Sequence, residues 1–179
     1  MRTLALDMAT HTGWAAGDTM DPWRISQSGV WYYGNGKRPF ELPKRLLLFR
    51  DDLNRAIDET GAVVLVYEIA HHRGGPATRS GIGMETVLVM TGYSRGLYVQ
   101  GVHSASLKKF ATGNGRAEKD DMIRVANETS PKIIRDDNEA DAFMLLNWGR
   151  TYVETGKNGT IRTKVQAVST KRKTKTKEL

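Results

Sequence analysis

The chain has 179 residues, enough for one domain with a core of ordinary size. It contains no cysteine, which excludes disulfide bonds and thiolate metal sites. No apolar run approaches the roughly 20 residues of a membrane span, and the N-terminus leads into a strand pattern. We therefore expect a soluble, unprocessed cytoplasmic protein without a membrane partner.

The formal net charge of +7 is unevenly distributed along the chain. The segment from Lys157 to the C-terminus holds eight basic residues and one acidic residue, so residues 1–156 are formally neutral. We predict one domain over residues 1–156 and a basic, flexible tail over residues 157–179 with non-specific affinity for phosphate backbones. A tail that only aids solubility is the alternative.

Three strands are predicted at the start of the chain. An apolar run ends on Asp7, and a turn of small and polar residues leads into a second run over residues 12–17. A third strand over residues 25–33 would complete an antiparallel meander. Asp7 is then placed where a strand leaves the core. A solvated Asp that opens a turn is the alternative interpretation.

A loop over residues 34–39 and an amphipathic helix are predicted next. Apolar residues recur at helical spacing at positions 42, 46, 49, 53 and 57, and Gly61 ends the helix. The continuous apolar run over residues 62–67 is typical of a parallel strand buried on both faces. This strand finishes on a second carboxylate, Glu68. A Glu that simply reaches solvent is the alternative.

A Gly-rich, basic segment over residues 71–83 is interpreted as a mobile loop that contacts DNA. Its basic side chains are His71, His72, Arg73 and Arg79. Zinc binding by the adjacent histidines is disfavoured, because the chain has no cysteine and no suitably spaced third ligand nearby. A helical face from Met84 to about residue 95 and a strand over residues 97–102 follow. Met84 and Met90 are interpreted as core or dimer-interface residues.

The stretch over residues 106–119 gathers cations around two glycines. The cations are Lys108, Lys109, Arg116 and Lys119, and the glycines are Gly113 and Gly115. Backbone amides freed by the glycines, next to these cations, form a plausible cradle for phosphate. A helix over about residues 116–127 follows.

An acidic cluster precedes the last predicted helix, over residues 136–146. Asp136 or Asp137 can cap that helix, and capping is also the alternative explanation of the whole cluster. Asp141 differs, because its apolar neighbours indicate a largely buried helix start. Asn138 and Asp137 lie three and four residues before Asp141, so their side chains can share its face.

Three carboxylates, Asp7, Glu68 and Asp141, therefore stand at the ends of predicted elements. Hard oxygen ligands suit Mg²⁺ or Mn²⁺. Two such ions about 3.5 to 4 Å apart can clamp the attacking water and the leaving oxygen of a phosphodiester displacement. The pattern predicts a site of this two-metal type.

At this point the chain resembles the RuvC-type Holliday junction resolvases of the RNase H-like superfamily, in a phage version. The resemblance runs from Leu4 to about Trp148. It rests on Asp7 with 12–15, Glu68 after its apolar strand, the stretches 106–109 and 113–119, and 139–142. It implies an α/β, RNase H-like fold with a five-stranded mixed sheet flanked by helices.

The resemblance also implies residue roles. Asp7, Glu68 and Asp141 would hold the metals, Lys119 would lie beside the scissile phosphate, and Lys108 or Lys109 would grip the strand. The chain departs from the family at the fourth ligand position, where Asn138 brings no charge. Either Asn138 is a weaker ligand or Asp137 takes its place.

A second departure follows Glu68, where relatives carry an aromatic wedge. Here the residues are Ala70, His71 and His72, and an imidazole could stack on an unpaired base. The predicted function is a Mg²⁺-dependent homodimeric endonuclease that nicks four-way DNA junctions symmetrically, with the helix over 84–95 as dimer contact. The alternatives are a debranching nuclease that acts on flaps, forks or RNA–DNA hybrids, and a catalytically silent junction-binding protein.

Overall fold

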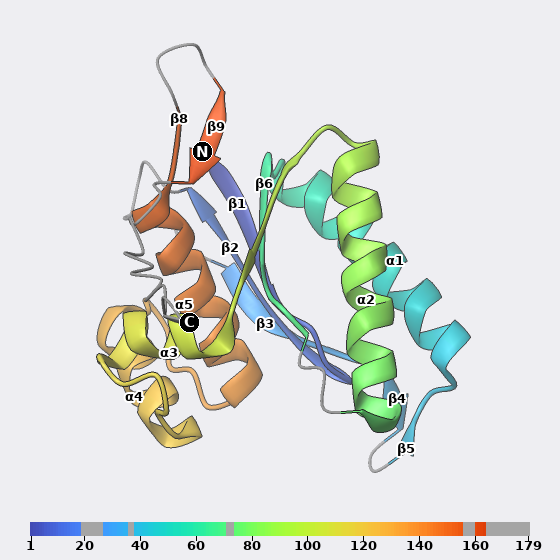
Figure 1. The fold of residues 1–179 in the computed structure, drawn as a ribbon, viewed down its shortest axis with the longest axis horizontal. Coiled ribbons are helices and arrows are strands. Elements are labelled where there is room, and N and C mark those ends of the chain that lie inside the picture. Colours follow the sequence, from blue (N-terminus) through green and yellow to red (C-terminus); the bar gives the residue numbers. More distant parts are fainter. Residues whose placement is uncertain (19–26, 36–37, 71–73, 156–159, 164–179) are drawn as a thin grey trace, which may run out of the picture.

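The computed structural model describes residues 1–18, 27–35, 38–70, 74–155 and 160–163. A central sheet lies between two layers of helices, with α1 and α2 on one face and α3, α4 and α5 on the other (Figure 1). The elements are β1 (Arg2–Asp7), β2 (His11–Asp18), β3 (Gln27–Tyr32), β4 (Gly34–Asn35), β5 (Arg38–Pro39), α1 (Leu42–Thr60), β6 (Val64–Glu68), α2 (Gly75–Ser94), β7 (Tyr98–Val102), α3 (Ser104–Thr112), α4 (Lys119–Thr129), α5 (Asp137–Tyr152), β8 (Val153–Thr155) and β9 (Ile161–Thr163).

The sheet has five strands in the order β3-β2-β1-β6-β7. β1, β2 and β3 pair antiparallel, whereas β1, β6 and β7 pair parallel. The predicted meander and the predicted five-stranded mixed sheet are confirmed. In the parallel register Leu6 pairs with Tyr67, so Asp7 and Glu68 follow at the same edge of the sheet.

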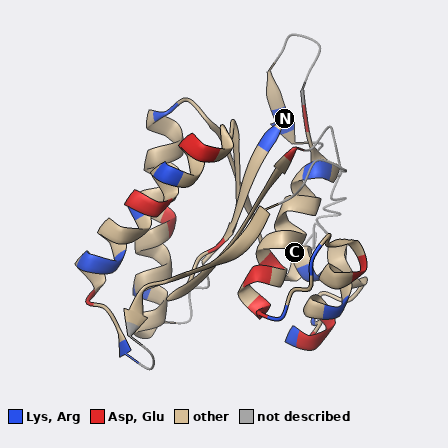
Figure 2. Ribbon diagram, turned by 180° about the vertical axis from the view of Figure 1, so that it is seen from behind, with Lys and Arg blue, Asp and Glu red and all other residues tan. Residues whose placement is uncertain are grey.

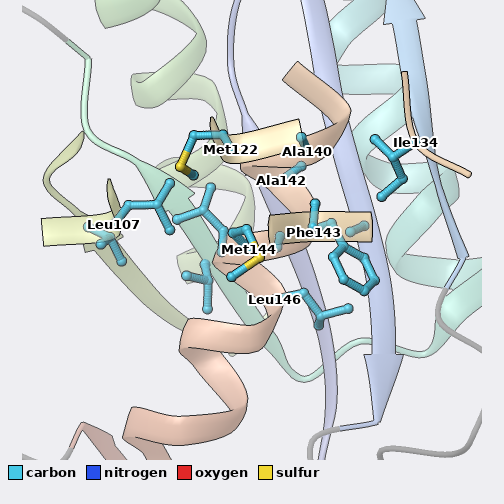
Figure 3. Close-up of a cluster of buried hydrophobic side chains, with 14 of the residues drawn as sticks. Leu107, Met122, Ile134, Ala140, Ala142, Phe143, Met144 and Leu146 are labelled. Carbon is cyan, nitrogen blue, oxygen red and sulfur yellow. The ribbon is translucent and has the colours of Figure 1, made fainter. Parts of the chain in front are cut away.

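Strand β1 is buried on both faces, and its side chains alternate between two cores. Ala5 belongs to the core under α3, α4 and α5, which Figure 3 shows around Leu107 and Phe143. Leu4 and Leu6 belong to the core under α1 and α2. The end of β1 is therefore fixed from both sides.

Two helix ends follow the sequence rules closely. Gly61 takes a left-handed conformation (φ 61°) directly after α1, as predicted. At the start of α5, Asp136 Oδ1 accepts hydrogen bonds from the backbone N–H groups of Asn138 (2.9 Å) and Glu139 (3.1 Å). Of the two predicted capping residues, Asp136 is the one that caps.

Three predicted boundaries are wrong. The loop predicted over residues 34–39 contains the short paired strands β4 and β5. The loop predicted over 71–83 is helical from Gly75 onward, where Gly81 and Gly83 serve packing: a Cβ on Gly81 would lie 3.2 Å from Ala70. Helix α4 begins at Lys119 rather than near 116, because Glu118 and Asp121 form a capping box there.

Part of the segment predicted as a tail is paired: β9 pairs with β8, and the Thr163 hydroxyl donates to Gln100 Oε1 at 2.6 Å. Residues 156–159 and 164–179 lie outside the described residues, so the boundary at 156 stays a prediction. No helix among the described residues is long and apolar enough to span a membrane.

Candidate active site

The first two predicted site carboxylates are placed by the parallel pairing of β1 and β6. Asp7 is the last residue of β1 and Glu68 the last residue of β6. Adjacent parallel strands present their carboxyl ends at one edge, so the two side chains lie on the same rim of the sheet. The alternative of two unrelated solvated carboxylates is disfavoured, because Asp7 is buried and the charge of Glu68 raises its pKa.

The third carboxylate, Asp141, is placed by the packing of α5 on β2. Gly13 pairs with Asp7 across the β1–β2 ladder, and α5 passes so close to Gly13 that a Cβ there would collide with the backbone of Asn138 and Glu139. One helical turn after Asn138, Asp141 faces the end of β1. Figure 2 shows acidic residues at the start of α5 and at the start of α4, with basic residues beside both.

The pKa shifts of Asp7 and Asp141 reflect their burial and the charges of neighbouring carboxylates. Burial raises the pKa of Asp7 well above its usual value, and the charges of Glu68, Asp141 and Asp137 raise it further. Burial and the charge of Glu68 raise the pKa of Asp141 to about 7, against the opposing effect of Lys108. The ionised forms of Asp7 and Asp141 are thus disfavoured both by burial and by neighbouring negative charges.

A cation would relieve this penalty, and the site fits one in charge and donor type. Asp141 Oδ1 is buried and has no hydrogen-bond partner. Oxygen donors of this kind suit Mg²⁺ or Mn²⁺. Among the described residues, no three Asp, Glu or His side chains are grouped tightly enough to hold a metal ion.

Asp137 and Asn138, the two candidates for the fourth ligand position, have different surroundings. The Asn138 side-chain amide donates to Asp136 Oδ1 at 3.3 Å, so its N–H group is engaged in the helix cap. Asp137, by contrast, raises the pKa of both Asp7 and Asp141. Asp136, at the same end of α5, raises the pKa of Asp7 as well, so two charged residues of this helix start act on Asp7.

Two lysines lie beside the carboxylates. Lys119 forms an ion pair with Asp137, and this pair raises the pKa of Lys119. The Lys119 side chain is 76% exposed, so its ammonium group remains accessible. Lys108 donates to the backbone carbonyl of Ala117 at 2.8 Å and lowers the pKa of Asp141. Lys108 thus holds the loop before α4 near the carboxylates.

Of the other residues predicted to contact DNA, three are described and exposed, and three lie outside the described residues. Lys109 on α3, Arg116 before α4 and Arg79 on α2 are exposed. His71, His72 and Arg73 lie outside the described residues. The predicted phosphate cradle is a compact turn: Gly113 (φ 79°) ends α3, and Asn114 Oδ1 accepts from the Arg116 backbone N–H at 3.0 Å.

Sequence reasoning missed two features of the site. Glu139 is buried and pairs with Lys132 at 2.6 Å, while the Ser28 hydroxyl donates to it at 2.7 Å, so it ties β3 to the start of α5. Arg45 on α1 reaches the turn after Asp7 and donates to Thr10 Oγ1 at 3.1 Å. Arg45 stands beside the apolar stripe of its helix, three residues after Leu42 and four before Phe49, and that position gave no signal of a contact with Thr10.

Comparisons with known proteins identify the fold. No family model matches the chain, and no curated protein matches it in sequence. The structure of Thermus thermophilus RuvC aligns with a TM-score of 0.62 and 14% identity, over 81% of this chain and 90% of that chain. The structure of T. thermophilus RuvC in complex with a Holliday junction substrate aligns with a TM-score of 0.63 and 12% identity, over 81% of this chain and 89% of that chain.

A third solved structure extends this likeness beyond bacteria. The yeast mitochondrial Holliday junction resolvase Ydc2 aligns with a TM-score of 0.61 and 12% identity, over 83% of this chain and 79% of that chain. All three alignments cover most of both chains. The resemblance drawn from the sequence is thus confirmed at the level of the fold: the chain has the RNase H-like fold of the RuvC-type Holliday junction resolvases.

Proposed function

We propose that this protein is a metal-dependent endonuclease that resolves four-way DNA junctions by paired, symmetric nicks. The observation that carries the proposal is the meeting of Asp7, Glu68 and Asp141 at one rim of a sheet whose fold is that of known junction resolvases. Buried carboxylates such as Asp7 and Asp141, whose pKa is raised by burial and by the charge of Glu68, are typical of a centre that works with bound cations.

In this proposal Asp7, Glu68 and Asp141 hold two Mg²⁺ ions, for which Mn²⁺ can substitute, and Asp137 supplies the additional charge that Asn138 lacks. When bound, such ions activate water and stabilise the leaving oxygen of an in-line phosphodiester displacement. The unpartnered Oδ1 of Asp141 supports its role as a ligand.

The chain's own cations would position the substrate. Lys119, exposed beside Asp137, would stabilise charge that develops on the scissile phosphate. The remaining proposed DNA contacts come from the residues around the rim. They are His71, His72, Arg73, Arg79, Lys108, Lys109 and Arg116, and the basic segment 157–179 would add non-specific affinity.

We further propose that the active species is a homodimer joined through α2. Ile82, Met90 and Tyr93 expose 40%, 67% and 84% of their surfaces on this helix. Met84, which the sequence assigned to the core or the interface, is fully buried and belongs to the core. A two-fold symmetric junction suits a two-fold symmetric protein with one site per subunit.

Cleavage of labelled DNA in Mg²⁺ tests the proposal. Wild type and Asp7→Asn are compared on a mobile junction, an immobile junction, a flap, a fork and linear duplex. Paired nicks on junctions, absent with Asp7→Asn and absent on duplex, are the expected result. Equal cleavage of flaps and forks would make the protein a debranching nuclease. Tight junction binding without cleavage, even in Mn²⁺, would make it a junction-binding protein.

A further inference from the structure

A cleft of about 580 Å³ opens directly beside the carboxylates. It is bounded by the turn after β1, the starts of α1 and α2, and α3. Met8, which follows Asp7, and Ala70, two residues after Glu68, both line it. Lys108, whose charge lowers the pKa of Asp141, lines it too. The cleft therefore lies next to the proposed catalytic rim, at the same edge of the sheet, and Figure 1 shows the start of α2 near the end of β1.

The charge of this cleft is positive. Its described lining residues include Arg45 and Lys108 and no Asp or Glu. The first turn of α2, which also borders it, contains no acidic residue. A helix start without acidic residues leaves the positive end of the helix dipole uncompensated, which adds to the effect of the two cations.

The Arg45 guanidinium group is held in place by one side-chain hydrogen bond, but its Nε–H donor has no partner. Its Nη1 donates to Thr10 Oγ1 at 3.1 Å, and the Thr10 backbone carbonyl accepts from the Tyr33 N–H at 2.9 Å, so the turn itself is pinned. Arg45 Nε is buried and has no hydrogen-bond partner. Within the described part of the chain, no carboxylate pairs with this guanidinium.

Other arginines of α1 behave differently. Arg50 forms an ion pair with Asp51 at 2.8 Å, and Arg55 pairs with Asp52. Both are exposed, as is usual for arginines on the solvent face of a helix. Arg45 alone among these three points into a cleft with a neutral partner. A buried, unpaired guanidinium N–H is costly unless a ligand completes its hydrogen bonds.

We infer that Arg45, with the Thr10 turn, forms a binding subsite for one backbone phosphate of the DNA strand, adjacent to the scissile phosphate. A guanidinium group can donate two parallel N–H hydrogen bonds to one phosphate. The Thr10 hydroxyl is neutral and accepts only one hydrogen bond from Arg45, so it does not replace such a partner. The inference rests on the proposed action on DNA and adds a positioning residue to it. By anchoring the DNA strand at the turn that follows Asp7, Arg45 fixes where that strand crosses the carboxylates.

Junction binding measured over a range of salt concentrations, in EDTA so that no cleavage occurs, tests this subsite. We expect Arg45→Gln to weaken binding about tenfold and to reduce the slope of log K against log salt by about 0.9, the loss of one phosphate contact. The matched control is Arg50→Gln, an exposed arginine on the same helix, for which the slope should not change. Arg45→Lys keeps the positive charge but loses the pair of parallel N–H donors of the guanidinium group. We expect this variant to retain the wild-type salt slope and to bind junctions more weakly.

Junctions with a single neutral methylphosphonate locate the contact in wild-type protein. A methylphosphonate at one position next to the cleavage site should weaken binding by the wild type. The same methylphosphonate should leave binding by Arg45→Gln unaffected, because that variant already lacks the guanidinium that contacts the phosphate. An unchanged salt slope in a folded Arg45→Gln protein, or additive losses at every methylphosphonate position, would overturn the subsite while leaving junction cleavage by the wild type intact. Failure of the wild type to bind junctions would instead remove the proposed function and the subsite with it.

Discussion

The backbone carbonyl of Asn138 lies against Gly13, in the space that a Cβ on residue 13 would occupy. The N–H of Glu139 would also be only 2.8 Å from that Cβ. Gly13 pairs with Asp7 in the β1–β2 ladder, so the missing side chain lets α5 approach the strand that carries Asp7. This contact, between a strand glycine and a helix start, sets the separation between Asp7 and Asp141.

We expect Gly13→Ala to lower the free energy of unfolding by about 2 kcal/mol or more, because backbone must move to admit the methyl group. Junction cleavage should fall further than stability alone explains, since α5 carries Asp141 away from Asp7. Urea denaturation and cleavage by the folded fraction measure the two effects.

Gly29→Ala is the matched control for this substitution. A Cβ on Gly29, in the same sheet, would meet only the Trp14 side chain at 3.1 Å, and a side chain can shift where backbone cannot. We expect a smaller loss of stability and no change in cleavage. Equal effects of the two substitutions would show that the Gly13 contact does not position α5.

The raised pKa of Asp141 makes the metal-free protein sensitive to pH. Its carboxyl has a pKa of about 7 in the folded chain and near 3.8 when exposed, so the folded state retains a proton that the unfolded state releases. Stability contributed by this group is therefore complete below about pH 4 and is lost as the pH rises through about 7. Asp7, also raised, acts in the same direction.

We expect Asp141→Asn to be more stable than wild type at about pH 8 in EDTA, by up to about 4 kcal/mol, and equally stable near pH 4. Thermal unfolding at both pH values measures this difference. Mg²⁺ should raise the unfolding temperature of the wild type and have less effect on the variant. Asp58→Asn, which removes an exposed carboxylate on α1, is the control. A variant less stable than wild type at high pH would contradict the repulsion between these carboxylates.

Much of the carboxylate site could be predicted because strand ends are visible in sequence. The apolar runs before Asp7 and Glu68 have the composition of buried strands, and parallel pairing then brings their last residues to one edge. The buried face around Asp141 likewise appears in the apolar neighbours on its helix. In each case the local pattern and the tertiary structure agree.

What the sequence could not predict depends on contacts between distant segments. The glycines of α2 resembled a loop, because nothing local indicates that Gly83 makes room for Leu46 of α1. The contact of Arg45 with Thr10 joins positions 35 residues apart. The different surroundings of Asp137 and Asn138 depend on the cap geometry of α5, since either side chain can share a helical face with Asp141.

The exposed apolar side of α2 predicts a dimer that one charge can disrupt. We expect Tyr93→Glu to convert the protein to a monomer, because Tyr93 is 84% exposed and a charge buried at an interface is costly. Analytical ultracentrifugation measures the change. Ile133→Glu is the control, since Ile133 is 72% exposed and lies away from α2, in the segment between α4 and α5. A wild type that sediments as a monomer, or a Tyr93→Glu protein that remains a dimer, would contradict an interface on α2.

The neighbouring residues Asp137 and Asn138 should respond in opposite ways to exchange of amide and carboxylate. Asp137→Asn removes a charge that acts on Asp7 and Asp141, so we expect half-maximal cleavage to require several-fold more Mg²⁺. Asn138→Asp places a second carboxylate where the amide now donates to Asp136, so we expect a loss of about 1 kcal/mol in stability and no lower Mg²⁺ requirement. Asn138→Ala loses the hydrogen bond from the amide to Asp136 without adding a charge. Comparison with Asn138→Asp therefore separates the loss of this hydrogen bond from the repulsion between two carboxylates. If Asn138→Asp instead cleaved junctions at lower Mg²⁺ than wild type, residue 138 would be the ligand position and Asp137 only the partner of Lys119.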